Sequence, residues 1–174
     1  MNTPYFELTV PLFQKNLRSL KGFLTKGFAY ATETGMSEAD FLASKLAPDM
    51  FPLVKQIQMI TDNAKGTTAR LAGVEPMSLP DTETTIAELM ARIEKVEAYL
   101  AMFTESQFAD AGTRVVTISY YPGQFITGND YLLQSALPNF FFHMSTAYGI
   151  IRMNGAPIGK SDFIGGANFQ PLTV

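Results

Sequence analysis

The side chain best suited to acid–base or ligand chemistry in this 174-residue chain is its only histidine, His143. An imidazole titrates near neutral pH and serves as general acid, general base or metal ligand. Asn139 lies one helical turn before it and Thr146 about one turn after it, so a helix would place all three in one polar patch. The alternative is a buried neutral imidazole with both nitrogens hydrogen-bonded.

Two polar residues near the middle of the chain are candidate partners of His143. Gln58 and Asp62 are four residues apart and share a face if this segment is helical. If that face meets His143, Asp62 would fix the imidazole tautomer or raise its pKa. A solvent-exposed carboxylate at Asp62 is the competing interpretation.

A tyrosine pair provides the last candidate. Tyr120 and Tyr121 are adjacent in a β-branched and aromatic stretch, so in a strand they face opposite ways. One of them is expected to pack inward and close over one end of the fold, and Tyr120 is counted among the ligand-binding candidates. Ordinary hairpin packing is the simpler explanation.

Several kinds of chemistry are excluded by composition. The chain has no cysteine, which excludes disulfides, thiolate nucleophiles and iron–sulfur clusters. No Gly-x-Ser-x-Gly or phosphate-binding loop occurs, and one histidine with scattered serines does not define a catalytic triad. Stable zinc sites take three or four protein ligands. No cofactor is therefore predicted, and a divalent metal held by His143 and Asp62 remains the alternative.

The net charge and the composition of the N-terminus limit which partners and which location are expected. Thirteen basic and sixteen acidic residues give a net charge of −3, which argues against a nucleic-acid partner. The densest basic group, Lys15 to Lys26, is typical of one solvated helix face. The N-terminus has no basic region and is interrupted by Pro4 and Pro11, unlike a signal peptide. With no cysteine present, a cytoplasmic location is expected.

The segment from Tyr131 to Ile151 carries no charge over 21 positions. It has the length of a membrane span, but it contains polar and helix-weakening residues, including Gln134, Pro138 and Asn139. We expect a central helix buried on nearly all sides, with a kink or local break at Pro138 and no membrane insertion.

Hydrophobic periodicity predicts an all-α fold in a single domain, residues 1–174. Long helices are expected over about 9–30, 49–73, 81–103 and 127–154, with a short helix over 37–47, strands over 114–121 and 124–127, and an irregular tail from 155. Three amphipathic helices and one apolar helix make a four-helix bundle, with a small β-hairpin between helices three and four.

Three blocks of sequence resemble a known bacterial family. They are LAPDMFPLVKQIQMITDNAKGTTARLAGVE (Leu46 to Glu75), ALPNFFFHMSTAYGIIRMNG (Ala136 to Gly155) and IGKSDFIG (Ile158 to Gly165). They are similar to domain of unknown function 1993, a family placed among DinB-like four-helix bundles; the helix start from Asp81 to Ile93 is also similar.

That resemblance implies the DinB-like fold and a place to look for a site. Many DinB-like proteins look like metal-binding proteins, and some are thiol-dependent transferases. Their usual ligands are one histidine from helix two and two from helix four, four residues apart. His143 matches the first of the helix-four pair, but Ala147 stands at the second position and only Gln58 and Asp62 are available on helix two.

Three functions remain open from sequence. The favoured one is a small-molecule-binding bundle with a pocket between helices two and four, lined by Gln58, Asp62, Asn139 and His143. The second is a metal-dependent hydrolase or thiol transferase with a degenerate metal site. The third is a structural homodimer, suggested by the aromatic content, and dimerisation is compatible with the first.

Overall fold

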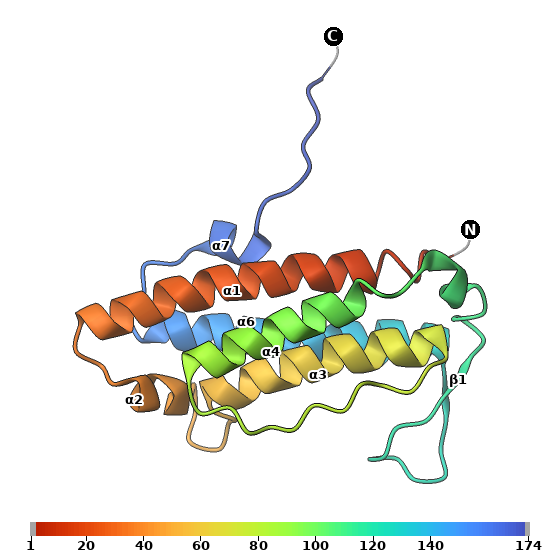
Figure 1. Ribbon diagram of the computed structural model, residues 1–174, viewed down its shortest axis with the longest axis horizontal. Coiled ribbons are helices and arrows are strands. Elements are labelled where there is room, and N and C mark those ends of the chain that lie inside the picture. Colours follow the sequence, from red (N-terminus) through yellow and green to blue (C-terminus); the bar gives the residue numbers. More distant parts are fainter. Residues whose placement is uncertain (1–2, 173–174) are drawn as a thin grey trace.

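Four long helices lie side by side in the computed structural model, which describes residues 3–172 (Figure 1). They are α1 (Val10–Glu33), α3 (Leu53–Ala72), α4 (Ile86–Leu100) and α6 (Leu137–Met153). The short helix α2 (Glu38–Ala43) joins α1 to α3. The predicted all-α four-helix bundle is confirmed; the ends of the expected 1–174 domain, residues 1, 2, 173 and 174, lie outside the described residues.

The helices do not simply alternate in direction. In Figure 1, α3 and α4 run the same way, so the chain from 73 to 85 returns along the full length of the bundle before α4 begins. α1 and α6 run in the opposite direction. A long crossover of this kind needs its own anchoring, because it has no regular backbone hydrogen bonds to hold it.

Local sequence explains where the helices begin and end. Ser37 caps α2 by accepting a hydrogen bond from the backbone of Asp40, and Thr85 and Glu88 form a reciprocal capping box at the start of α4. Gly73 ends α3 in the left-handed conformation, with φ +75°. Both capped starts lie close to predicted boundaries, although α4 begins later than the expected 81.

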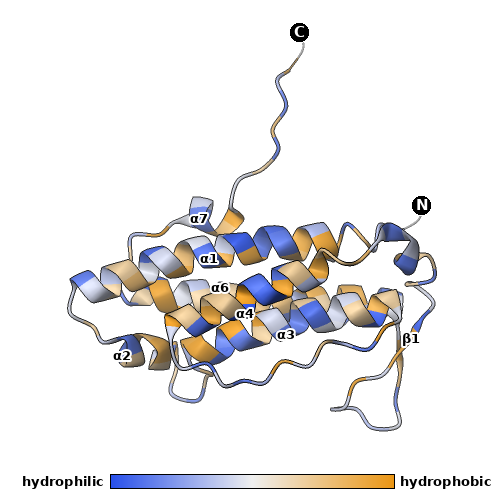
Figure 2. Ribbon diagram, in the orientation of Figure 1, coloured by the Kyte–Doolittle hydropathy of each residue, from blue (hydrophilic) through white to orange (hydrophobic). Residues whose placement is uncertain are grey.

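The core follows the predicted seams. Figure 2 shows apolar and hydrophilic residues alternating along α1, α3 and α4, as expected for helices buried on one face. The largest fully buried side chains are Phe13, Phe23, Phe41, Phe140, Leu17, Leu20, Leu24, Leu53, Ile57, Ile60, Leu71 and Leu89. They come from α1, α2, α3, α4 and α6, so one core joins all the layers.

The expected break at Pro138 takes the form of a π-helical segment, Tyr131–Ala136, which follows the single turn α5 (Gly128–Asp130) and leads directly into α6. Proline has no N–H to donate and its ring crowds the carbonyl one turn earlier, and a wider turn relieves that conflict. The prediction that this helix is buried on nearly all sides is wrong. Phe142 is 55% exposed, and Asn139 and Ser145 also face solvent.

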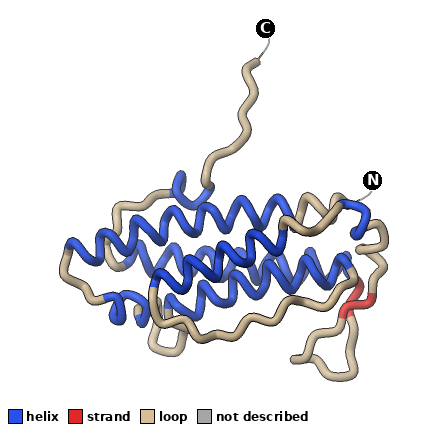
Figure 3. Tube along the Cα trace, viewed as in Figure 1, coloured by secondary structure: helices blue, strands red, loops and turns tan. Residues whose placement is uncertain are grey.

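The connection from α4 to α6 contains a 3-10 turn, η1 (Glu105–Phe108), and the predicted hairpin. Only two residues pair on each side, β1 (Val115–Val116) with β2 (Ile126–Thr127), antiparallel, at one end of the bundle (Figure 3). The tail, expected to be irregular, contains α7 (Lys160–Ile164), which lies against α1. Across residues 3–172, no helix combines the length and apolarity that a membrane crossing requires.

Candidate functional site

His143 lies at the contact between α6 and α3 and is 6% exposed. Its Nδ1 atom is 2.7 Å from Oε1 of Gln56, which is 1% exposed and sits in the first turn of α3. The pair therefore joins the second and fourth long helices, the two that the sequence predicted to meet at a site. The partner on α3, however, is Gln56 rather than Gln58 or Asp62.

The hydrogen bonds of Gln56 fix which atom of His143 carries the proton. The amide nitrogen of Gln56 donates to the carbonyl of Phe51 at 3.0 Å, so its oxygen is the atom facing the imidazole. A carbonyl oxygen can only accept, and Nδ1 must therefore donate. A neutral His143 held in this way carries its lone pair on Nε2.

The second ring nitrogen is available to solvent. Among the described residues no side chain or backbone group pairs with Nε2 of His143, and no enclosed side-chain nitrogen or oxygen lacks a partner. Nε2 must therefore reach the molecular surface. The ring of Phe142 packs edge-on against the imidazole of His143, with 5.2 Å between the ring centroids. Phe142 is about half exposed and so adds an apolar surface beside His143.

Burial of the ring also sets its charge. Desolvation lowers the pKa of His143 below its ordinary value of 6.5, because the charged imidazolium loses more hydration than the neutral ring. No carboxylate contacts the ring to offset this effect among the described residues. At neutral pH the arrangement presents an unprotonated nitrogen that can accept a hydrogen bond or a proton.

The two α3 residues predicted to face His143 face α4 instead. Gln58 donates to Glu83 at 2.9 Å, and Asp62 accepts from Arg92 at 2.7 Å and lies 3.1 Å from Lys65. Residues 58 and 62 share one face of α3, whereas residue 56 projects from nearly the opposite side, since each step in a helix turns by about 100°. The expectation that Asp62 would hold the imidazole is therefore wrong.

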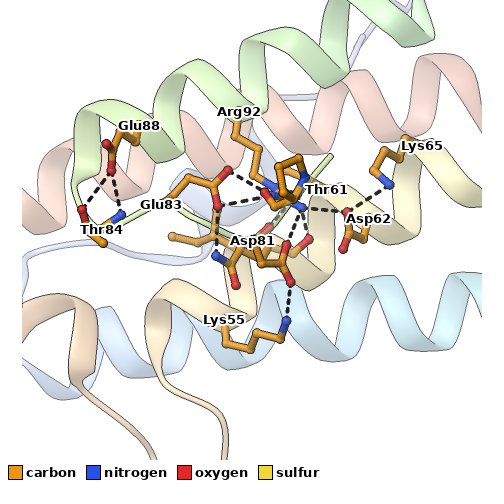
Figure 4. A network of polar contacts seen from close by, with 12 residues as sticks. Lys55, Thr61, Asp62, Lys65, Asp81, Glu83, Thr84, Glu88 and Arg92 are labelled. Atoms are coloured by element: carbon orange, nitrogen blue, oxygen red, sulfur yellow. Dashed lines mark hydrogen bonds and ion pairs between the residues drawn. The ribbon is translucent and has the colours of Figure 1, made fainter. Parts of the chain in front are cut away.

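These residues belong to a polar cluster centred on Arg92, shown in Figure 4. Arg92 lies on α4, and its side chain is completely buried. It donates to Thr61, to the Pro80 carbonyl, to Asp62 at 2.7 Å and to Glu83 at 2.9 Å, and it forms an ion pair with Asp81 at 2.9 Å. Lys55 pairs with Asp81 from the far side.

The Arg92 cluster is electrically balanced. Three cations, from Lys55, Lys65 and Arg92, face three carboxylates, from Asp62, Asp81 and Glu83. Partial burial raises the pKa of both Asp81 and Glu83, but their partners outweigh it and leave both pKa values below their ordinary range. The partners are Lys55 and Arg92 for Asp81, and Arg92 and Gln58 for Glu83. The cluster anchors the crossover segment against α3 and α4.

The remaining candidates are dispersed. Tyr120 is 86% exposed on the hairpin, and neither it nor Tyr121 packs inward, so that expectation is wrong. The hairpin meets the end of α3, where Arg114 donates to the Leu71 carbonyl, whereas Gln56 lies at the helix start. Asn139 is exposed on α6, one turn before His143. Thr146 is buried and donates to the Phe142 carbonyl.

The residues present do not fit the metal site that DinB-like proteins usually carry. Within residues 3–172 no three His, Cys, Asp or Glu side chains are arranged so that they could hold a metal ion. The side-chain oxygen of Gln56, which faces His143 from α3, already accepts the Nδ1 proton. Ala147 has no side-chain atom that could bind a metal. One imidazole nitrogen is too small a donor set for zinc or its neighbours.

Surface hollows of about 290–480 Å³ lie elsewhere on the molecule. Two border the hairpin, one lies between α1 and α7, one lies beside the N-terminal turn and η1, and one is at the α2 end of the crossover. His143 lines none of these five. The site at His143 is therefore a surface-reaching nitrogen rather than a deep cavity.

Comparison with known proteins shows which family the chain belongs to. The model of the domain of unknown function DUF1993 matches residues 5–164. A crystal structure of a DinB family member protein from Shewanella denitrificans is 38% identical, covers 96% of this chain and 95% of its own, and superposes with a TM-score of 0.92. No curated protein matches the chain. The chain therefore belongs to the DUF1993 family and has the DinB-like four-helix fold.

Proposed function

We propose that this protein binds a small molecule at the surface where Nε2 of His143 emerges between α3 and α6. The observation that carries the proposal is the orientation of a single imidazole. Its Nδ1 proton is committed to Gln56, and its Nε2 has no partner among the described residues. Proteins that use a histidine as acceptor or base commonly fix the other ring nitrogen in this way.

The chemistry of the atom defines the kind of ligand. An unprotonated Nε2 accepts a hydrogen bond, so the ligand must supply an O–H or N–H group. Phe142 lies beside the imidazole and offers an apolar surface, and exposed Asn139 one turn away offers both an amide donor and an acceptor. A hydroxyl- or amide-bearing small molecule with an apolar portion matches these three groups.

Chemical modification and ligand screening test this proposal. Diethyl pyrocarbonate acylates unprotonated, accessible imidazole nitrogens, and the chain has a single histidine. We expect one adduct on His143 at neutral pH in the folded protein. Fragments that bind should shift the His143 imidazole resonances, and binding should be lost in His143→Asn, which keeps a donor toward Gln56 and removes Nε2.

A matched control is available on the same helix. Ser145→Ala alters a neighbouring exposed polar residue and should leave fragment binding unchanged. The proposal fails if His143 resists acylation in the folded protein, or if no bound fragment depends on Nε2. A fragment that binds wild type and His143→Asn equally well would show a different site.

A second candidate function is homodimerisation through the outer face of α6. Phe142 and Met153, both more than half exposed, lie eleven residues apart and so share one side of the helix. Ser145 and Gly149 lie between them on that side, and the stretch carries no charge before Arg152. Light scattering should then give a dimer that Phe142→Asp dissociates, whereas a monomer at micromolar concentration would contradict this candidate.

A further inference from the structure

The groove between α1 and α7 has a charge pattern that the rest of the acidic chain lacks. From Val10 to Thr32, α1 carries four cations and no acidic residue. Lys15, Arg18 and Lys26 line a hollow of about 480 Å³ that α7 closes on one side. Lys21 is turned the other way, toward Glu94 and Glu97 on α4. The sequence alone suggested only a solvated helix face here.

From this groove we propose that the protein binds the phosphate group of a small phosphate monoester between α1 and α7. This site is separate from His143 and does not depend on the proposed function there. The groove has unbalanced positive charge, a hydroxyl donor at Ser161, open space at Gly22 and a close α1–α7 approach at Gly165.

The charges that line the groove do not cancel. Lys26 pairs with Asp162 of α7, and the second oxygen of Asp162 accepts the Gly159 N–H at 2.7 Å, so this carboxylate is fully engaged. Lys15 has no ion pair among the described residues. Arg18 has only Glu97, at 3.7 Å and therefore beyond hydrogen-bond distance, and its side chain is 63% exposed. Two cations remain available for an anion.

Glycines shape the groove around these charges. At Gly22 a side chain would meet nothing within 4 Å, so the floor beside the cations is open space. At Gly165, where φ is +67°, a side chain would overlap the Ser19 hydroxyl, so only glycine allows α7 to approach α1 this closely. Ser19 and Ser161 line the same hollow; the Ser19 hydroxyl donates to the Lys15 carbonyl at 3.3 Å, and the Ser161 hydroxyl is a donor for an anion oxygen.

The size and surroundings of the groove select a small ligand. Lys15 and Arg18 suit a phosphate group, because a guanidinium donates to two of its oxygens while an ammonium acts as a point charge. A long polyanion would meet Glu94 and Glu97 on the adjoining side of α1, in a chain of net charge −3. A phosphate monoester is small enough for a hollow of this volume.

Amide NMR titration with inorganic phosphate, at fixed ionic strength, tests the inference. We expect saturable shifts confined to 15–26 and 160–165. The double variant Lys15→Ala/Arg18→Ala should weaken phosphate affinity by about tenfold or more, since each charge-assisted hydrogen bond contributes roughly 1.5–3 kcal/mol. The matched control Lys45→Ala/Lys95→Ala removes two exposed lysines elsewhere and should bind as wild type does.

Two further arms separate the sources of the phosphate group. Glycerol 3-phosphate in solution and vesicles containing phosphatidic acid present the same monoester, free or at a lipid surface. Binding of either one that depends on Lys15 and Arg18 supports the inference and identifies the source. Shifts that are equally large with chloride, or a double variant that binds phosphate as tightly as wild type, would overturn it.

Discussion

Nδ1 of His143 on α6 lies 2.7 Å from Oε1 of Gln56 on α3, and this single contact defines the chemistry of the α3–α6 interface. It assigns the ring proton to Nδ1 and leaves Nε2 as an acceptor at the surface. It also occupies Oε1 of Gln56 on α3, the oxygen that could otherwise have joined His143 in holding a metal.

Gln56→Glu should raise the pKa of His143. The substitution places a carboxylate against Nδ1 in a buried setting, and a nearby negative charge favours the imidazolium. NMR titration of the single histidine measures the change. Gln134→Glu, on an exposed position of the same helical segment as His143, is the control and should shift the titration much less. A pKa in Gln56→Glu equal to that of wild type would contradict the contact.

Stability should decrease as the pH falls below about 6.5, through His143. The folded-state pKa lies below 6.5, so on acidification the unfolded chain takes up a proton first and unfolding becomes more favourable. The loss begins near the unfolded pKa and levels off below the folded one. Urea unfolding of the wild type between about pH 5 and pH 8, a range that brackets the ordinary histidine pKa, should show that the free energy of unfolding falls as the pH falls. His143→Asn should lack this fall, and an unchanged slope would refute the assignment.

Arg92→Leu should destabilise the protein by about 3–5 kcal/mol, because it leaves Asp62, Asp81 and Glu83 without their shared buried counter-charge. Chemical denaturation measures the loss. Lys95→Ala, on the exposed side of the same helix, should change stability by no more than about 0.5 kcal/mol. Equal stabilities of the two variants would show that the cluster does not anchor the crossover.

The same cluster predicts sensitivity to acid. The folded pKa values of Asp81 and Glu83 lie below their ordinary 3.8 and 4.5, so their contribution is complete above those values and is lost as the pH falls through the folded pKa. Glu83→Gln should therefore be less stable than wild type at pH 7 and lose less stability on acidification. The control Glu75→Gln changes an exposed carboxylate on the crossover and should follow the wild-type curve.

Two glycines on α1 should respond oppositely to alanine. At Gly27 an added methyl would overlap Ile151 of α6, and overpacking of this kind costs about 1–3 kcal/mol. At Gly22 the methyl meets nothing within 4 Å, and the gain in helix propensity is worth about 0.5–1 kcal/mol. Thermal unfolding distinguishes them. A stabilised Gly27→Ala variant would contradict the close α1–α6 packing.

The fold could be predicted because each helix carries its own apolar seam. The residues Leu53, Ile57 and Ile60 define the buried face of α3 without reference to any partner. The helix α7 was not predicted, because it is short and follows glycine and proline. Burial of α6 on all sides was also wrong, since absence of charge does not show which face a neighbour covers.

The site could be predicted only in part. The sequence pattern predicted that His143 lies where the second and fourth long helices meet. Which residue of α3 contacts His143 depends on how those two helices are rotated against each other. Gln56 lies three residues after Leu53 and beside Ile57, so a polar residue on an apolar seam was its only signal. Arg92 gave a similar signal beside Ile93, yet only the crossover supplies the carboxylates that allow its burial.

The most direct test of the account is the tautomer of His143 by long-range ¹H–¹⁵N NMR at neutral pH. The structure predicts a neutral ring with the proton on Nδ1 and a bare Nε2. The proposed function predicts that the Nε2 resonance shifts when ligand is added. A proton on Nε2, or an imidazolium that persists at neutral pH, would contradict both the Gln56 contact and the proposed binding site.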